Sequence, residues 1–159
     1  MTPAHIAYAL TALAHAGFLV VGLVLIRVDV LEHRLPDVIV LPSGAALALF
    51  YAAAGALDGD LARAGRAAAG GVALFLLYLL LRAAAPAGLG GGDVKLAAPV
   101  GMFLAWHGWA TLAVGAAAAF VLAAVCALAL MAAGRASRDT HIAFGPFMLV
   151  GAWAGVLLT

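Results

Sequence analysis

Long apolar runs separated by short polar stretches dominate the chain. The runs approach the length of about 20 residues that a helix needs to cross the hydrocarbon core of a bilayer. They do not alternate polar and apolar positions, as strands of a membrane β-barrel do. The pattern therefore predicts an all-α, polytopic membrane protein with six transmembrane helices. The expected spans are 6–26, 38–57, 67–81, 96–109, 112–133 and 142–158.

Composition supports this prediction and narrows the possible partners. Of the 159 residues, 67% are hydrophobic and 9% are charged, whereas soluble domains are about half apolar and about a quarter charged. The net charge of +1 gives no reason to expect a nucleic-acid partner. No linker divides the chain, so one membrane-embedded domain over residues 1–159 is expected. The single cysteine, Cys126, and the scattered histidines do not have metal-ligand spacing, so neither a metal nor a cofactor is predicted.

The segment 88–96, GLGGGDVKL, breaks the apolar pattern. Each glycine costs a helix about 1 kcal/mol relative to alanine, and an aspartate at bilayer depth costs roughly 2.5–3.5 kcal/mol. Irregular backbone at that depth occurs only where protein buries it or where it lines a wet cavity. If Trp106 and Trp109 mark the opposite interface, the segment dips below the membrane surface and Asp93 is recessed by about 7 Å. We therefore expect an irregular loop that faces a water-filled cleft, with Asp93 either as a reactive group or as the cap of the following helix.

The distribution of basic residues predicts the orientation. The connections after the first, third and fifth spans hold six of the eight Lys and Arg residues: Arg27, Arg34, Arg82, Lys95, Arg135 and Arg138. The opposite side holds Arg63 and Arg66. The positive-inside rule then places the first set in the cytoplasm and both termini outside. Asp29 follows the first span and Asp93 the third, so both are expected at the cytoplasmic face, where they can meet.

Two carboxylates that meet in a partly desolvated site share one proton, because both cannot ionise at low cost. The ionised group can then take a proton from water while the protonated group polarises a peptide carbonyl. This chemistry is aspartic peptide hydrolysis. Acids in membranes also serve proton and ion pathways, so a small transporter subunit remains an alternative at this point. Transporter acids more often lie at mid-membrane, whereas Asp29 and Asp93 are both expected toward one face.

Three motifs resemble one known family. Residues 90–93, GGGD, match the GxGD motif of membrane aspartic proteases, and the run 88–96 resembles the second catalytic motif of the type IV prepilin peptidases. Asp29, seven residues ahead of Pro36, resembles the first motif of that family. Residues 142–147, IAFGPF, are similar to its FGPF segment before the last span. The motifs occur in the family's order and extend over nearly the whole chain.

The resemblance implies a GxGD aspartic protease in the cell inner membrane, with Asp29 and Asp93 as the catalytic pair at the cytoplasmic face. The implied substrate is a prepilin, pseudopilin or preflagellin-like protein with a short basic leader and a hydrophobic helix; the lipid bilayer is the other partner. Larger members carry an N-terminal region with paired cysteines for zinc, linked to N-methylation. This chain resembles the short forms of the Tad/Flp-pilus and preflagellin systems. A non-catalytic pilin-assembly protein remains a further alternative.

Five further residues are expected to shape the site. Gly90 and Gly92 would let a peptide approach the backbone beside the aspartate. Pro36 would fix the geometry of its loop. Asp37 is either a further acid of the site or the N-cap of the second span. Lys95 either extends to the membrane interface, or lowers the pKa of one aspartate or binds acidic groups of the substrate.

Overall fold

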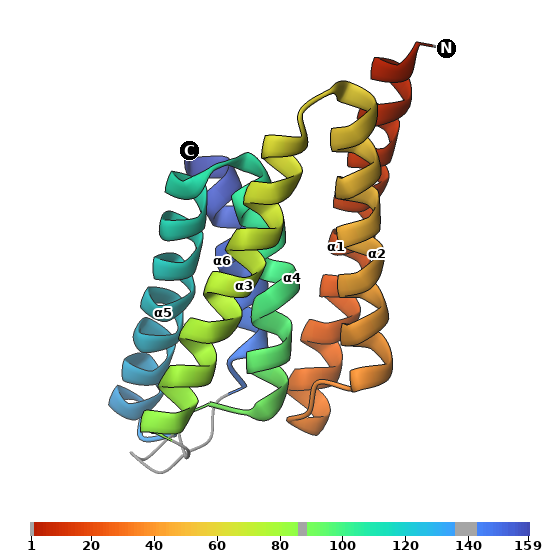
Figure 1. Ribbon diagram of the computed structural model, residues 1–159. Helices are drawn as coiled ribbons and strands as arrows, with labels where there is room; N and C mark the ends of the chain where they lie inside the picture. The colour runs from red at the N-terminus through yellow and green to blue at the C-terminus, as the bar shows by residue number, and fades with distance from the viewer. Residues whose placement is uncertain (1, 86–88, 136–142) are drawn as a thin grey trace.

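The computed structural model describes residues 2–85, 89–135 and 143–159, and these residues form helices joined by short connections (Figure 1). The helices are α1 (Pro3–Glu32), α2 (Asp37–Asp58), α3 (Leu61–Ala84), α4 (Gly91–His107), α5 (Trp109–Ala132) and α6 (Gly145–Leu158). Over the described ranges the secondary structure is entirely helical, which confirms the all-α prediction. Gly88, Arg138 and Ile142, which the sequence analysis used, lie outside the described residues.

Four helices, α1, α2, α3 and α5, are long and apolar enough to cross a membrane. Helix α4 has 17 residues and α6 has 14, so at about 1.5 Å per residue they extend roughly 26 and 21 Å. Both are shorter than the hydrocarbon core of about 30 Å. The chain is thus a helical membrane protein, and the crossing of α4 and α6 stays a prediction.

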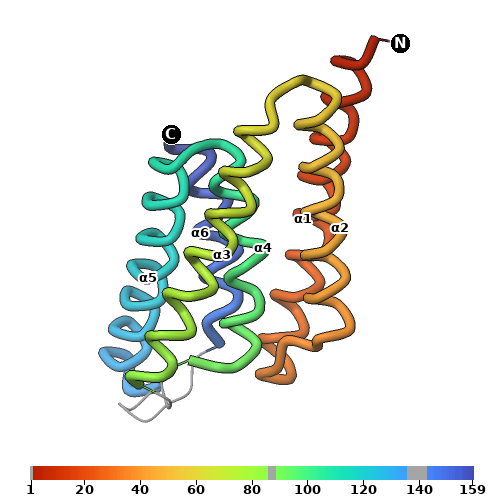
Figure 2. The backbone as a smooth tube through the Cα atoms, in the orientation of Figure 1, coloured from red at the N-terminus to blue at the C-terminus, as the bar shows by residue number. Residues whose placement is uncertain are grey.

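Successive helices run in opposite directions, so both chain ends lie at one end of the bundle (Figure 2). The connection between α1 and α2 and the starts of α4 and α6 lie at the opposite end. Helices α1 and α2 form a pair beside the other four (Figure 1). Helix α4 is central, because it contacts α2, α3, α5 and α6.

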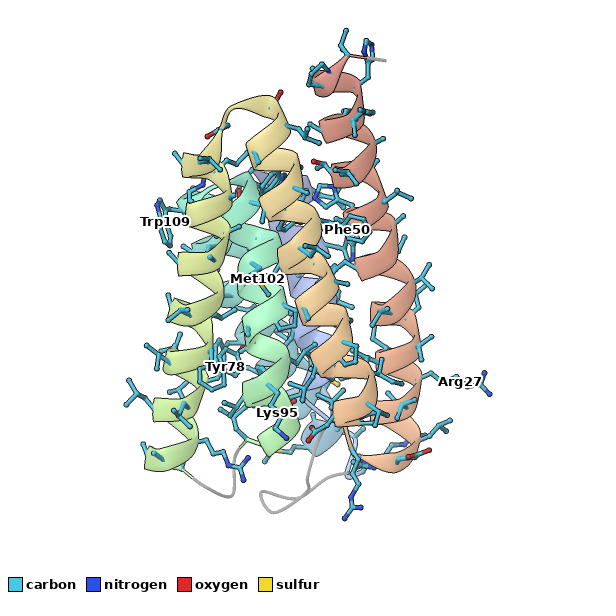
Figure 3. The ribbon with its side chains drawn as sticks, turned by 45° about the vertical axis from the view of Figure 1, so that its right-hand side comes forward. Arg27, Phe50, Tyr78, Lys95, Met102 and Trp109 are labelled. Atoms are coloured by element: carbon cyan, nitrogen blue, oxygen red, sulfur yellow. The ribbon has the colours of Figure 1, made fainter. Side chains whose placement is uncertain are left out.

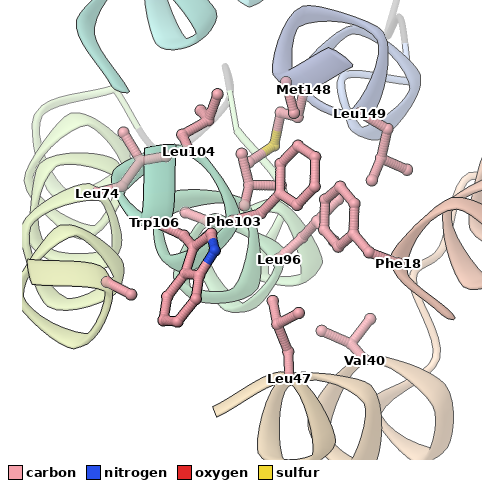
Figure 4. Packing of buried hydrophobic residues seen from close by; sticks show 14 of the residues in the cluster. Phe18, Val40, Leu47, Leu74, Leu96, Phe103, Leu104, Trp106, Met148 and Leu149 are labelled. Atoms are coloured by element: carbon pink, nitrogen blue, oxygen red, sulfur yellow. The ribbon is translucent and has the colours of Figure 1, made fainter. Parts of the chain in front are cut away.

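The core surrounds α4 (Figure 4). The Phe103 ring stacks on Phe18 of α1 with ring centroids 4.2 Å apart. Trp106, predicted to lie at the membrane interface, is instead 2% exposed, and its ring stacks on Tyr51 at 4.2 Å. Neighbouring helices cover the side of α4 that carries Trp106, so this side chain does not face lipid, and its depth at the interface stays a prediction. Trp109 is 53% exposed, as an interfacial tryptophan would be.

Small residues bring two helix pairs into close contact. A Cβ atom on Gly70 of α3 would lie 2.9 Å from the carbonyl oxygen of Gly101 on α4. A Cβ on Gly155 of α6 would lie 2.7 Å from the Cα of Gly115 on α5. Membrane helices that lack a hydrophobic driving force between them gain van der Waals contact by such approaches. The abundance of glycine therefore has a structural cause at these positions.

The connection between α2 and α3 is shorter than the stretch 58–66 that the expected spans leave between them. Helix α3 includes Arg63 and Arg66, and its N-cap is Asp60, whose Oδ1 accepts a hydrogen bond from the Arg63 N–H at 2.9 Å. The Arg66 Nε donates to the carbonyl of Ala105 at 2.8 Å, and the Arg63 Nε donates to that of Trp106 at 3.1 Å. These carbonyls end α4 and lack helical partners. The two arginines thus supply hydrogen-bond donors for the free carbonyl groups at the end of the central helix.

Candidate active site

Asp29 lies in the last turn of α1. The apolar pattern instead predicts a polar loop at this position. The residues after the first apolar run include good helix formers, so the helix continues to Glu32. It ends at His33, whose φ of 51° is left-handed and whose N–H donates to the Asp29 carbonyl at 2.9 Å. The Asp29 side chain is 5% exposed, and its Oδ2 accepts a hydrogen bond from the Gly145 N–H at 3.1 Å. Hydrogen bonds therefore hold both the backbone carbonyl and the carboxylate of Asp29.

Asp93 is the third residue of α4, and its side chain is 7% exposed. The irregular glycine loop predicted here is shorter than expected, because the helix already begins at Gly91. The Asp93 Oδ2 accepts a hydrogen bond from the Gly90 N–H at 2.9 Å. N–H groups at the start of a helix have no helical partner, and a carboxylate at the third position accepts a hydrogen bond from one of them. Its negative charge is also stabilised by the positive end of the helix dipole. Asp93 thus does cap its helix, while its carboxylate also lines a cavity.

Asp29 and Asp93 line the same cavity, of about 870 Å³, at the end of the bundle where α1 ends and α4 begins. The parity of the crossings predicts this meeting. The cavity is also lined by the other residues predicted for the site: Pro36, Asp37, Gly90, Gly92 and Lys95. Figure 3 shows Lys95 at this end of α4, whereas Arg27 points away from the bundle. The structure therefore gathers all seven predicted site residues in one place.

The space beside the glycines is occupied by protein. A Cβ on Gly92 would lie 2.7 Å from the Cβ of Leu35, and one on Gly91 would overlap the guanidinium of Arg82. A Cβ on Gly90 would lie 3.1 Å from the Asp93 Oδ2. These glycines are needed because side chains of the cavity approach them closely. The predicted approach of a peptide to Gly92 would first require Leu35 to move.

Three residues that touch the site were not assigned a role from the sequence: Gly145, Leu35 and Arg82. Gly145 begins α6 and donates its N–H to Asp29, and a Cβ there would lie 2.6 Å from the Asp29 Oδ2. Leu35 lies against both Gly92 and Gly145. The FGPF resemblance could have pointed to Gly145. No sequence pattern assigns Leu35 or Arg82 to the site, because their contacts depend on how the helices pack.

Asp37 and Lys95 form an ion pair. The Lys95 Nζ lies 2.6 Å from the Asp37 Oδ2 and 2.7 Å from its Oδ1. Asp37 is the first residue of α2, the N-cap is Pro36, and no side chain caps this helix end. The N-cap role predicted for Asp37 is therefore wrong, since the carboxylate reaches across to α4. The two roles predicted for Lys95 stay predictions.

The ion pair is expected to contribute little to stability. The two side chains are 42% and 52% exposed, and exposed pairs contribute about 0–1 kcal/mol. We expect Asp37→Ala, Lys95→Ala and the double variant to unfold in detergent within about 1 kcal/mol of one another. A double-mutant cycle from thermal unfolding measures the coupling. A coupling well above that value would mean that the pair holds α2 against α4.

Asp93 lies just before the apolar stretch 96–109. Burial raises the pKa of its carboxyl group. The pKa of Asp93 is raised to about 6, mainly by desolvation and also by the nearby negative charge of Asp29. The hydrogen bond from the Gly90 N–H and the positive charge of Arg82 act in the opposite direction. Asp93 therefore keeps its proton to a higher pH than an ordinary aspartate does.

Histidines lie at the far end of α4. The His107 Nδ1 is 3.0 Å from the Phe103 carbonyl oxygen, and its ring stacks on that of His15 at 4.9 Å. His107 ends the helix that Asp93 begins, so it has no part in the aspartate cavity. Among the described residues, no group of three His, Cys, Asp or Glu side chains could hold a metal ion.

The fold and the site together define a helical membrane protein in which two buried carboxylates, from α1 and α4, line one polar cavity. The chain belongs to the type IV leader peptidase family, whose model matches residues 16–134. It is 32% identical over 137 residues to a prepilin leader peptidase/N-methyltransferase of Stutzerimonas stutzeri, covering 82% of this chain and 44% of the relative.

A second relative, with the same name, comes from Pseudomonas putida. It is 32% identical over 146 residues, which cover 85% of this chain and 46% of the relative. The chain thus spans less than half the length of these curated relatives. No solved structure matches the chain.

Proposed function

We propose that residues 1–159 act as one membrane-embedded aspartic endopeptidase that removes the short basic leader of prepilin-like proteins. The observation that carries this proposal is the single cavity lined by both Asp29 and Asp93, each with a carboxylate oxygen bonded to a glycine N–H. Membership of the leader peptidase family, and relatives named prepilin leader peptidase, support the choice of substrate.

In the proposed mechanism the two carboxyl groups hold one proton and one water molecule between them. Burial raises the pKa of both acids, and more strongly that of Asp93, so we assign the shared proton to Asp93 and the ionised form to Asp29. Asp29 removes a proton from the water, whose oxygen attacks the peptide carbonyl carbon, while the Asp93 proton stabilises the carbonyl oxygen. The tetrahedral intermediate collapses when Asp29 passes the proton it took from the water to the leaving nitrogen. The C–N bond then breaks, the carbonyl reforms and Asp93 again holds the shared proton. The N-terminus of α6 supports the negative charge on Asp29.

We further propose that all six helices cross the inner membrane, with both termini outside and the aspartate cavity at the cytoplasmic face. The excess of basic residues at that end of the bundle supports this orientation. A leader that precedes a membrane helix emerges at the same face. Both acids lie at one end of the bundle, which favours a peptidase over a proton-coupled transporter.

The direct test is cleavage of a prepilin in membranes. The chain is co-expressed with a prepilin that carries a basic leader, in a host without a leader peptidase, and the product is identified by mass spectrometry. A single cut between leader and hydrophobic segment is expected. An intact prepilin in membranes that contain the inserted chain would contradict the proposal and favour a non-catalytic assembly protein.

Arg82→Gln is expected to move the alkaline limb of the pH profile of kcat/KM to higher pH. The positive charge of Arg82 lowers the pKa of Asp93, so its removal lets the pair keep the shared proton to higher pH. In the unchanged protein the limb should lie near pH 6 and not near the ordinary value of 3.8. Arg27→Gln, which removes the same charge from a side chain directed away from the bundle, is the control. Equal limbs in both variants would contradict the role of Arg82.

A further inference from the structure

An apolar groove lies between α1, α2, α4 and α6, with a cavity volume of about 90 Å³. Side chains such as Phe18, Leu47 and Leu149 form its walls (Figure 4). Among its lining residues Ser43 is the polar one, and its hydroxyl donates to the Val40 carbonyl at 2.9 Å. The groove therefore offers no free polar side chain and suits a hydrocarbon ligand.

The groove begins close to the aspartate cavity. It is lined by Leu25, one turn before Asp29 on α1, and by Leu96, one turn after Asp93 on α4. From Leu25 it extends along α1 to Leu13, twelve residues away, which is about 18 Å at helical rise. It thus starts one helical turn from each acid and runs toward the opposite end of the bundle.

The groove is also open at its side. Leu13 is exposed, and a Cβ placed on Gly17 would meet no atom within 4 Å. These positions lie at the middle of the apolar part of α1, so the opening faces lipid. An apolar chain can enter from the bilayer without first passing through the polar cavity.

We propose that this groove docks the hydrophobic helix that follows the cleavage site of the substrate. The inference rests on the proposed function. A peptide bond held between Asp29 and Asp93 has its basic leader outside the membrane and its apolar continuation directed into the bilayer. The groove lies along that continuation, and its length of about 18 Å equals that of about twelve helical residues, whose apolar side chains would enter it from the lipid side. Burial of this segment supplies binding energy remote from the reacting bond.

A second apolar groove lies on the outer side of α1 and α6 and includes Leu23 and Ala154. It is lined by residues of α1 and α6 alone, so it does not connect Asp29 with the helix that carries Asp93. Both grooves have apolar linings, so apolarity alone does not select an occupant for either. The connection to both acid-bearing helices therefore favours substrate as the occupant of the inner groove.

The test fills the inner groove without disturbing the fold. Gly17→Leu places a bulky side chain into open space and raises helix propensity. Kinetics are measured in detergent with the full-length prepilin and with a short peptide that ends a few residues after the cut. We expect KM for the prepilin to rise about 10-fold, corresponding to about 1.4 kcal/mol, with kcat nearly unchanged. Cleavage of the short peptide should be unaffected.

Two matched variants serve as controls. Gly65→Leu adds the same side chain to an exposed position of α3 where a Cβ also meets nothing within 4 Å. Ala154→Leu fills the outer groove. Neither should change KM for the prepilin. An unchanged KM in Gly17→Leu, a rise in Ala154→Leu instead, or an equal effect on prepilin and short peptide would each overturn the proposal.

Photocrosslinking separates this proposal from the proposed function. A benzophenone amino acid is placed at position 17 or 65 in the Asp93→Asn background, with the prepilin co-inserted. Crosslinks from position 17 to the hydrophobic segment support docking, even if the unaltered chain cleaves no prepilin and the proposed function fails. Crosslinks from position 17 to lipid alone, in a protein that does cleave prepilin, overturn docking and leave the peptidase intact.

Discussion

Asp29→Asn and Asp93→Asn, each alone, are expected to lower the rate of leader cleavage by about 10³-fold or more, because neither amide can take or give the proton. Asparagine keeps the shape of aspartate, and its amide oxygen can still accept the hydrogen bond from Gly145 or Gly90. The protein should therefore insert and fold normally. Initial rates with a reconstituted prepilin measure the loss.

The controls for this prediction separate catalysis from charge. Asp58→Asn removes a carboxylate from the end of α2 opposite the cavity and should leave the rate unchanged. The double variant should be no slower than either single variant, because the two acids act as one unit. Cleavage at a near-normal rate by either single variant, at equal membrane levels, would exclude the pair as the catalytic groups.

Gly145→Ala is expected to reduce kcat by on the order of 10²-fold. The added Cβ would lie 2.6 Å from the Asp29 Oδ2 and 3.3 Å from a methyl carbon of Leu35. The carboxylate must then move and lengthen its hydrogen bond to the start of α6, and small displacements of a reacting group have large effects on rate. KM should change little, because Asp29, Leu35 and Gly145 are not among the residues that line the apolar groove.

Gly65→Ala is the matched control for Gly145→Ala, since its Cβ would meet nothing within 4 Å on an exposed face of α3. Thermal unfolding in detergent of both variants shows whether the fold is kept. A Gly145→Ala protein that folds normally and retains half or more of its kcat would mean that the bond from Gly145 does not position Asp29.

Much of the fold follows from hydrophobicity. The apolar runs predict the six helices in order, and the even number of crossings between Asp29 and Asp93 predicts that they meet. Helix ends were less predictable, because polar residues such as Glu32 and Arg63 extend α1 and α3 beyond the apolar runs. Once a helix is started, each added residue of good propensity continues it.

The contacts that complete the site could not be predicted in the same way. The donors to Asp29 and Asp93 are backbone N–H groups of Gly145 and Gly90, and every residue except proline carries such a group. The partner of Lys95 lies on another helix, 58 positions earlier in the sequence. The burial of Trp106 depends on the helices around α4. All of these follow from packing, which a pattern along one helix does not encode.

Leu35 connects these observations, because one side chain meets the glycine at the start of α4 and the glycine at the start of α6. The short link between α1 and α2 thus works as a spacer that keeps the helices of both acids at a fixed separation. Lengthening that link by one residue would move the leucine away from both glycines and loosen its contact with the starts of α4 and α6. The geometry of the acid pair thus depends on four residues, 33–36, none of which is itself an acid.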